Sequence, residues 1–302
     1  MFFCRVKNFL MKVIVLGGSG GMGRFASRAI SSFESIGLIT IADLNADAAK
    51  EFAESFASNK ITGIGLDVLD KKALKSILAE HDVVLNLTGP FFKFAYPILE
   101  VALEENCHYL DICDDWEPTE KMFALNELAQ EKNRTAIIGL GASPGITNLL
   151  ALKAMSELDE VKKIYTGWDI SSAEPEEESS QSDVNAAMVH GIEQMVGKVK
   201  VFTNNKFQMV RPLKRVDISY PDLGDFKVSI FGHPEAITFP HHYPEISESL
   251  NLMHGADVSF RFIFKILRFW IEMKVLPKNT AARIIGWLEK KNPKVPNNSL
   301  KE

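Results

Sequence analysis

A short apolar run followed by closely spaced glycines limits what this chain can fold into more than any other feature. The run occupies residues 13–16 and leads directly into Gly18, Gly20 and Gly23. This G-x-G-x-x-G spacing is typical of a loop that joins a β-strand to an α-helix and binds a dinucleotide. One glycine makes the turn, one lets the backbone approach the pyrophosphate, and one lets helix and strand pack closely. Free N–H groups at the start of the helix then bind the anion.

The same loop fits a second motif, because Gly17, Ser19 and Gly21 match the G-x-S-x-G elbow of serine hydrolases. A second strand pattern at residues 38–42 ends at Asp43, and an acid there accepts hydrogen bonds from ribose hydroxyls. The elbow requires a later acid and histidine, and it does not predict an acid at the end of the second strand. The context therefore favours the dinucleotide site.

Composition excludes several classes of protein. The 302 residues are 46% hydrophobic and 24% charged, which is typical of a soluble globular protein with two domains. A net charge of −5 argues against a nucleic-acid partner. The three cysteines form no disulfide framework and indicate a reducing compartment, so we expect a cytoplasmic protein. No apolar run is long enough for a membrane-spanning helix. Residues 1–10 fit a signal peptide poorly and indicate an extension or a misassigned start before Met11.

Strand and helix patterns alternate over the first half of the chain. Strands are expected at residues 13–16, 38–42, 61–66, 83–87, 109–112 and 135–139. Helices are expected at residues 21–33, 47–56, 71–79, 95–105 and 117–132, with a further start at Ser143 and Pro144. This order predicts an α/β fold, a doubly wound parallel sheet of the Rossmann class spanning residues 1–145. Ligand is expected at the carboxyl ends of its strands.

The pattern changes in the second half. Residues 146–245 are expected to form an α+β domain with a mixed or antiparallel sheet, including a hairpin that turns at Asn204 and Asn205. Residues 246–302 are expected to be a C-terminal helical segment with a polar tail. The helix expected at 258–275 has one narrow polar stripe and is otherwise apolar. Its apolar surface must be covered, and a core or second subunit is favoured over a membrane because the net charge is negative.

Three segments at expected strand ends indicate a family. With Gly89-Pro-Phe-Phe92, the run from Ala102 to Asp115 and the run from Gly141 to Leu149, the chain resembles the saccharopine dehydrogenase-like oxidoreductases. The resemblance implies a nicotinamide-binding domain, a second domain that also serves dimerisation, and a cleft between them. It further implies hydride chemistry at a carbon–nitrogen bond of an amino-acid-derived small molecule. We therefore expect a small-molecule substrate and a homodimer.

The chain departs from the family pattern in one of these segments. Saccharopine-forming members carry Gly-Leu-Asp-Pro-Gly-Ile-Asp-His, and here Ser143, Thr147 and Asn148 replace the two acids and the histidine. A site that recognised a cationic amine through those acids would lose that recognition. The substitution argues against saccharopine itself as the substrate and indicates a separate branch of the family.

The cofactor is expected to be NAD or NADP, with NAD modestly favoured. Asp43 would repel a 2′-phosphate, and Leu44 stands where NADP-preferring proteins tend to place an arginine, although Arg24 could reach the phosphate. The residues expected to bind the cofactor are Gly18, Ser19, Gly20, Gly21, Met22, Gly23, Asp43, Asp67, Thr88, Gly89 and Pro90. An ordinary strand-to-helix turn is an equally good interpretation of Pro90.

Candidate catalytic residues follow from the same strand ends. Asp111 and Asp114 are candidates for amine binding or proton transfer, and His190 for acid–base chemistry from the second domain. A structural histidine is the competing interpretation of His190. Asp115 is expected to be a solvated acid at a helix start. The residues expected to contact the substrate are Phe91, Ser143, Asn148, Trp168 and Arg211, the last with a surface arginine as its alternative.

No metal site is expected. His233, His241 and His242 lack the spacing of a helical zinc pair, and Pro234 and Pro240 favour loops around them.

The sequence therefore predicts an oxidoreductase that transfers a hydride between a nicotinamide cofactor and an amine, imine or carbonyl carbon. Two alternatives stay open. The apolar segment 258–275 is compatible with a membrane-associated enoyl or lipid-pathway reductase of the same family. The lost acids at Ser143 and Thr147 are compatible with a nucleotide-binding protein without catalysis.

Overall fold

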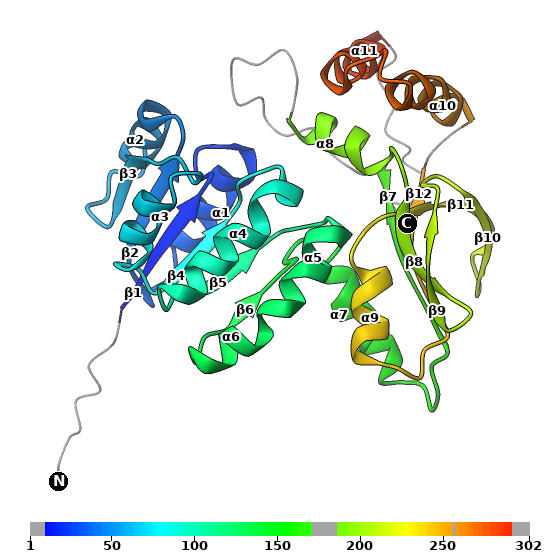
Figure 1. Cartoon of the computed structure of the whole chain (residues 1–302), viewed down its shortest axis with the longest axis horizontal. Coiled ribbons are helices and arrows are strands. Elements are labelled where there is room, and N and C mark those ends of the chain that lie inside the picture. Colours follow the sequence, from blue (N-terminus) through cyan, green and yellow to red (C-terminus); the bar gives the residue numbers. More distant parts are fainter. Residues whose placement is uncertain (1–9, 171–185, 256–257, 292–302) are drawn as a thin grey trace.

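The computed structural model describes residues 10–170, 186–255 and 258–291, which form two β-sheets with their associated helices (Figure 1). The first sheet is parallel, with strand order β3-β2-β1-β4-β5-β6. Its strands are β1 (Met11–Leu16), β2 (Ile36–Asp43), β3 (Ile61–Gly65), β4 (Val83–Asn86), β5 (His108–Asp111) and β6 (Ala136–Ile137). The order reverses between β1 and β4, where ligands of such sheets bind at the carboxyl ends. The predicted doubly wound fold is confirmed.

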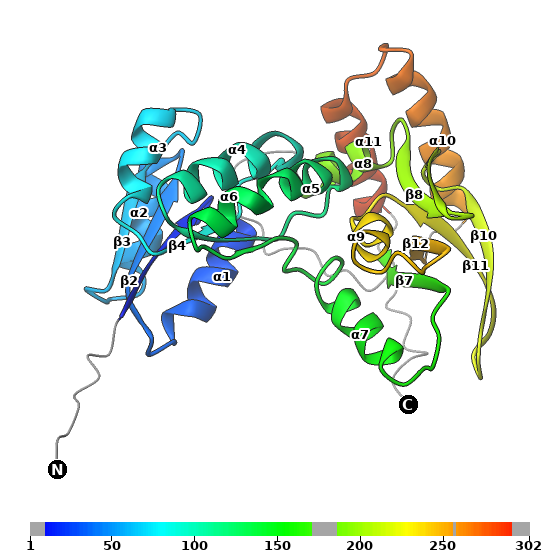
Figure 2. The same ribbon diagram turned by 60° about the horizontal axis from the view of Figure 1, so that its bottom comes forward.

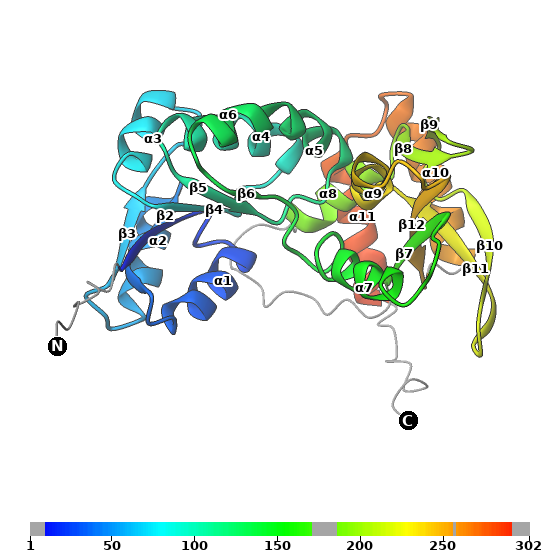
Figure 3. The same cartoon turned by 90° about the horizontal axis from the view of Figure 1, so that it is seen from below.

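Helices cover both faces of this sheet (Figure 3). They are α1 (Gly21–Ser31), α2 (Ala46–Glu54), α3 (Lys71–Leu78), α4 (Phe91–Glu104), α5 (Trp116–Met122), a 3₁₀ turn η1 (Phe123–Leu125) and α6 (Asn126–Glu131). Alternate residues of β1 serve the two cores: Val15 packs in the cluster with Phe52 of α2, and Ile14 in the cluster with Leu99 of α4. A strand buried on both faces explains the continuous apolar run before the glycines.

Three helices differ from expectation by more than a few residues at one end or in continuity. The helix expected at 95–105 starts at Phe91, directly after Pro90 at its N-cap. The helix expected at 117–132 is divided into α5, η1 and α6. The helix expected to start at Ser143 and Pro144 is α7 (Ile146–Met155), because Gly145 has a φ of 119° that helical residues do not adopt.

The second sheet is mixed but mostly antiparallel, as expected. Its order is β10-β11-β12-β8-β9, and β7 pairs with β12 in parallel. Its strands are β7 (Lys163–Asp169), β8 (Val199–Thr203), β9 (Lys206–Val210), β10 (Arg215–Tyr220), β11 (Gly224–Phe231) and β12 (Glu248–His254). The predicted hairpin at Asn204 and Asn205 is confirmed, with φ angles of 53° and 59° that asparagine tolerates.

Four further helices complete the second domain: α8 (Ala186–Gln194), α9 (Glu235–His242), α10 (Val258–Glu272) and α11 (Lys278–Lys291). Figure 2 shows α10 and α11 side by side, and one core cluster joins α8, α10 and α11 to Phe231 and Met253 of the sheet. The expected loops around Pro234 and Pro240 are wrong, because α9 includes Pro240 in its last turn and starts directly after Pro234. Within the described residues, no helix is both long and apolar enough to cross a bilayer.

Candidate active site

The glycine loop has the geometry that its spacing predicts. A Cβ on Gly23 would lie 2.2 Å from the carbonyl oxygen of Gly17, and one on Gly18 would lie 2.8 Å from Cγ2 of Ile41. A Cβ on Gly20 would meet only the Gly17 oxygen at 3.4 Å, so the outer side of the loop is open. Gly20 is the N-cap of α1, no side chain caps the helix, and its first turn has no acid. The backbone N–H groups there fit a pyrophosphate.

Two charged side chains are fixed beside the loop. Asp43, at the end of β2, accepts hydrogen bonds at 3.2 Å from the backbone N–H groups of Ser19 and Asn45. Arg24 donates from Nε to the Ser19 carbonyl at 2.8 Å, and its guanidinium lies 4.6 Å from the centre of the Phe52 ring. The acid is therefore placed for a ribose diol, with one cation close by.

The remaining expected cofactor residues lie at the same edge of the sheet. Gly21 and Met22 begin α1, and Asp67 is exposed just after β3. Thr88, Gly89 and Pro90 join β4 to α4, and nothing lies within 4 Å of a Cβ built on Gly89. The Thr88 hydroxyl is buried without a hydrogen-bond partner among the described residues.

Asp111 has a different environment from the other acids. It is fully buried and accepts hydrogen bonds from the N–H groups of Cys113 and Gly139 and from the Tyr109 hydroxyl, at 2.8–3.0 Å. Burial raises the pKa of Asp111 and outweighs these hydrogen bonds. The Asp111 side chain links the end of β5 to the segment after β6 through these hydrogen bonds. It therefore has a structural role and does not belong to the cluster of ionisable side chains described next.

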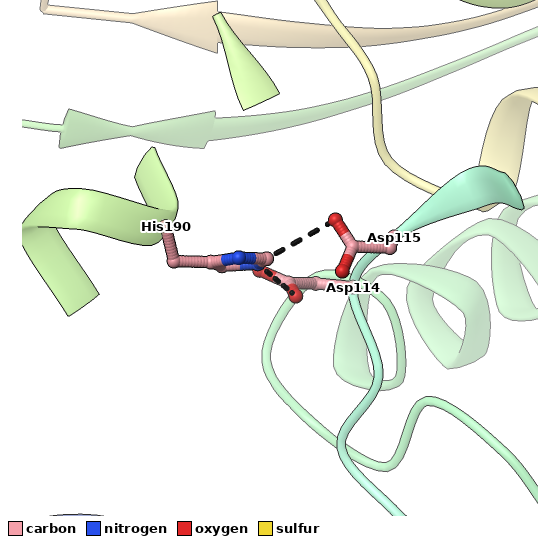
Figure 4. A group of neighbouring side chains, drawn as sticks. All are labelled: Asp114, Asp115 and His190. Atoms are coloured by element: carbon pink, nitrogen blue, oxygen red, sulfur yellow. Dashed lines mark hydrogen bonds and ion pairs between the residues drawn. The ribbon is translucent and has the colours of Figure 1, made fainter. Parts of the chain in front are cut away.

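A cluster of three ionisable side chains joins the two domains (Figure 4). His190 of α8 donates from Nε2 to Oδ1 of Asp114 at 3.0 Å, and the same nitrogen lies 3.5 Å from Oδ1 of Asp115. Both acids lie between β5 and α5. Gln194, one turn further along α8, donates to Asp115 Oδ1 at 3.3 Å. The side chains are 12–27% exposed, so the pairing is only partly screened by water.

The cluster shifts the protonation of its members in different directions. Burial lowers the pKa of His190, but the hydrogen bond to Asp114 and the charges of both acids outweigh it and raise the pKa to about 8. Burial likewise opposes ionisation of Asp114, yet the hydrogen bond and charge of the histidines hold its pKa below the usual range. Burial raises the pKa of Asp115 to about 6. Two groups therefore titrate near neutral pH.

Two polar atoms of the cluster have no partner among the described residues. They are Nδ1 of His190 and Oδ2 of Asp115, both buried. Buried polar atoms are almost always hydrogen-bonded, so these two atoms are candidates to meet a ligand. The three side chains also place donor atoms within 4.8 Å of one another, as a metal site would. The raised pKa of His190 favours a proton there, because a metal requires the neutral imidazole.

A second polar network adjoins the cluster. Glu235 at the start of α9 is fully buried, and its Oε1 accepts hydrogen bonds from Ser143 at 2.5 Å, Thr147 at 2.7 Å and Asn251 at 3.2 Å. The single Ser143 proton goes to Glu235, so His233 Nδ1 donates to the Ser143 oxygen at 3.0 Å.

His233 connects this network to the ionisable cluster. Its Nε2 lies 3.9 Å from Oδ2 of Asp114. Burial lowers the pKa of His233, against the opposing charge of Asp114. Its ring stacks on Trp168 with centroids 5.3 Å apart, and Trp168 donates from Nε1 to Asn251 at 3.1 Å. The polar groups thus form one continuous chain from α8 to β12.

The structure brings together only part of the expected substrate set. Ser143 and Trp168 belong to the second network, and Phe91 makes an edge-on ring contact with His190 at 6.4 Å. Asn148 instead accepts the Gly145 N–H at 2.9 Å and caps α7. Arg211 lines a different cavity, bounded by α10.

Several residues of the site were missed by sequence reasoning. Asp115 was expected to be solvated but is 9% exposed beside His190, because α8 of the second domain covers the start of α5. The other members of the two networks are Gln194, His233, Glu235, Thr147 and Asn251. Two of them carried a signal: Thr147 was noted as the replacement of a family acid, and His233, a histidine beside a proline, was considered for a metal.

Comparison with known proteins shows what the first domain resembles. Residues 13–137 match the model of the saccharopine dehydrogenase NADP binding domain. Saccharopine dehydrogenase (NADP(+), L-glutamate-forming) of Schizosaccharomyces pombe is 28% identical over 120 residues, which are 40% of this chain and 25% of that protein. Carboxynorspermidine synthase of Vibrio alginolyticus is 22% identical over 274 residues, covering 83% of this chain and 64% of that protein.

A solved structure supports the fold over most of the chain. Apo saccharopine dehydrogenase (L-Glu forming) from Saccharomyces cerevisiae matches with a TM-score of 0.57 and 20% identity, covering 85% of this chain and 57% of that one. The chain thus spans between a quarter and two thirds of these relatives' lengths. Residues 13–137 are thus similar to the NADP binding domain of saccharopine dehydrogenases, and the solved structure extends the similarity of fold over most of the chain.

Proposed function

We propose that this protein transfers a hydride between a nicotinamide nucleotide and an amine, imine or carbonyl carbon of an amino-acid-derived small molecule. The observation that supports this most directly is the cluster of Asp114, Asp115 and His190 beyond the carboxyl end of β5. Two of its groups have pKa values of about 6 and about 8, which suits proton transfer near neutral pH.

The cofactor part of the proposal is supported by the glycine loop. The open side of Gly20 and the uncapped first turn of α1 would hold the pyrophosphate. Asp43 would accept hydrogen bonds from the ribose hydroxyls, which favours NAD modestly over NADP because the carboxylate repels a 2′-phosphate. Asp67, Thr88, Gly89 and Pro90 would line the rest of the site. The bound nicotinamide would supply or accept the hydride.

The proton part follows from the state of His190. Asp114 holds the imidazole in its protonated form, and the Nδ1–H of that form has no partner within the described chain. When a substrate carbon receives a hydride, the nitrogen or oxygen bonded to it needs a proton. We propose that His190 donates this proton and that Asp114 keeps the imidazole of His190 in the required orientation. In the reverse direction His190 would take the proton back.

The substrate part is supported by the surroundings of the cluster. Phe91 contacts His190, and Trp168 lies against His233. Aromatic rings and hydrogen-bonding groups therefore lie side by side at the cluster, as they do in sites that bind small molecules. Ser143 and Thr147 hold hydroxyls where saccharopine-forming relatives hold acids, which supports a substrate other than saccharopine. The second domain would also form the contact of a homodimer.

Nucleotide binding and turnover test the proposal separately. Purified protein should quench or enhance the fluorescence of NADH or NADPH, and a panel of amino acids with oxo acids, imines and aldehydes should reveal oxidation of the bound nucleotide. His190→Gln should keep nucleotide binding and lose at least about 100-fold in turnover, as expected for loss of an acid–base group. His242→Gln, on the exposed end of α9, is the matched control.

Absence of nucleotide binding would overturn the cofactor assignment. Unchanged turnover in His190→Gln would overturn the proton assignment.

A further inference from the structure

Helix α10 presents three chemically distinct faces. Phe264, Leu267 and Ile271 are buried against the second domain. A second row is basic and contains Arg261, Lys265 and Arg268. A third row is apolar and exposed, and it contains Phe262, Ile266, Phe269, Trp270 and, just past the helix, Met273. Spacings of three and four residues place each row on one side of the helix. The expected burial therefore holds for one face of α10 only.

The basic row borders a groove that gathers cations from two parts of the chain. The groove has a volume of about 690 Å³ and is lined by α10 and by the connection between β9 and β10. Its cationic residues are Arg211, Lys214, Arg215, Arg261, Lys265 and Arg268. Its other lining residues are apolar, and none is acidic. Phe262 belongs to both the groove and the exposed row, so the two surfaces are continuous.

Most of these cations have no acidic partner among the described residues. Arg268 donates to the Pro212 carbonyl at 3.3 Å and lies 4.0 Å from Glu272. The other five groove cations make no ion pair with any part of the chain that the structure describes. A chain with a net charge of −5 thus concentrates unpaired positive charge on one side. Because salt screens charges beyond about 10 Å, this local charge governs what the face attracts.

The apolar row narrows the choice of occupant. Phe262 is 64% exposed and Phe269 56% exposed, and the indole of Trp270 lies beside them at 46%. A free phosphate would pair with the cations and leave these rings in water. A second copy, meeting the same face across a twofold axis, would bring further cations and no acid from the groove. A surface that offers anions and hydrocarbon together satisfies both rows.

We propose that α10 and the basic groove beside it bind the surface of a membrane that contains anionic phospholipids. The cations contact the headgroups, and the row from Phe262 to Met273 enters the layer between headgroups and acyl chains. Trp270 has the amphipathic ring that favours this layer. The groove of Arg211 to Arg215 lies on the second domain, so the proposal is independent of the hydride chemistry.

Vesicle flotation tests the proposal on the full-length protein. Vesicles of phosphatidylcholine alone are compared with vesicles that contain about 30 mol% phosphatidylglycerol, and partitioning should rise about tenfold or more with the anionic lipid. Added sodium chloride should reduce the binding, because the attraction is partly electrostatic. Equal flotation with both vesicles, or none with either, overturns the proposal.

Two double variants separate the two rows. Arg261→Glu with Lys265→Glu should abolish the preference for anionic lipid, and Phe262→Ser with Phe269→Ser should weaken binding to anionic vesicles about tenfold. Lys206→Glu with Lys227→Glu changes charge equally on exposed strand residues outside the groove and should bind as the wild type does. Circular dichroism and nucleotide binding establish that each variant is folded.

The other occupants give distinct results. If the wild type sediments as a dimer that the α10 variants dissociate, and no vesicle is bound, the face joins two copies and the proposal fails. If inorganic phosphate protects the groove from lysine-modifying reagents while vesicles do not bind, the groove is a small-anion site and the proposal fails as well. Wild-type flotation by both double variants would also overturn it.

Discussion

Ser143 donates a hydrogen bond to Glu235 across 2.5 Å, although the two residues are 92 positions apart in the chain. Ser143 precedes α7 and Glu235 begins α9, so the contact ties the end of the first domain to the second. Thr147 donates to the same oxygen at 2.7 Å. Two hydroxyls from the start of α7 therefore satisfy one interior carboxylate of α9.

Truncation of Glu235 should destabilise the protein strongly. Glu235→Ala leaves the half-buried hydroxyls of Ser143 and Thr147 and the buried amide of Asn251 without their common acceptor, and we expect a loss of about 3 kcal/mol in the free energy of unfolding. Urea denaturation followed by circular dichroism measures it. Glu245→Ala, at an exposed position, should change stability by less than about 0.5 kcal/mol. A similarly small change in Glu235→Ala would contradict the structural role.

A methyl group on Gly23 should weaken nucleotide binding. Its Cβ would lie 2.2 Å from the Gly17 carbonyl oxygen, so the loop must move away from the start of α1. We expect Gly23→Ala to weaken NADH binding more than about tenfold, since the backbone N–H groups lose their alignment. Gly191→Ala in α8 is the matched control, because nothing lies within 4 Å of a Cβ there. Fluorescence titration compares the two. Equal affinity would remove the loop from the cofactor site.

Local patterns predicted the first sheet well because its determinants are local. The alternation of strands and helices, the glycine spacing and the acid after β2 each depend on a few neighbouring residues. The hairpin at Asn204 and Asn205 was predictable for the same reason, since asparagine tolerates the positive φ that the turn requires.

The site was less predictable because its contacts cross the domains. Asp115 lies near a helix start, where a solvated acid is the usual case, and only the approach of Gln194 and His190 from α8 buries it. Glu235 lies in a stretch with prolines on both sides, and its three donors are at least 16 residues away in sequence. No local pattern contains such pairings.

Replacement of Asp43 should shift nucleotide preference. Asp43→Ser removes the carboxylate that would repel a 2′-phosphate, and Arg24 stays beside the loop to pair with it. We expect the ratio of NADPH to NADH affinity to rise about tenfold relative to the wild type. Asp47→Ser, in the first turn of α2, controls for loss of charge alone. Calorimetric titration with both nucleotides gives the ratio, and an unchanged ratio would place the ribose elsewhere.

Replacement of Asp115 by a neutral residue should stabilise the protein at neutral pH. Burial raises its pKa from 3.8 to about 6, so its contribution to stability is present below pH 3.8 and is lost as the pH rises through 6. At pH 7.5 the folded state holds a disfavoured charge, and Asp115→Asn removes it. We expect unfolding to cost about 3 kcal/mol more in the variant. Asp159→Asn, which is exposed, should have little effect. A destabilised Asp115→Asn at this pH would contradict the assigned cost of its charge.

The pairing of His190 with Asp114 should make stability fall with pH in a defined window. The pKa of His190 is about 8 when folded and 6.5 in its ordinary state, so the folded protein binds the proton more tightly. The stabilisation is complete below pH 6.5 and is lost as the pH rises through 8, by about 2 kcal/mol in the free energy of unfolding. Urea denaturation at intervals from pH 6 to 9 measures it. His190→Gln should lack this decrease, and His242→Gln should retain it. An identical pH profile in His190→Gln would show that the imidazole is neutral in the folded protein, and His190 would then hold no extra proton for transfer.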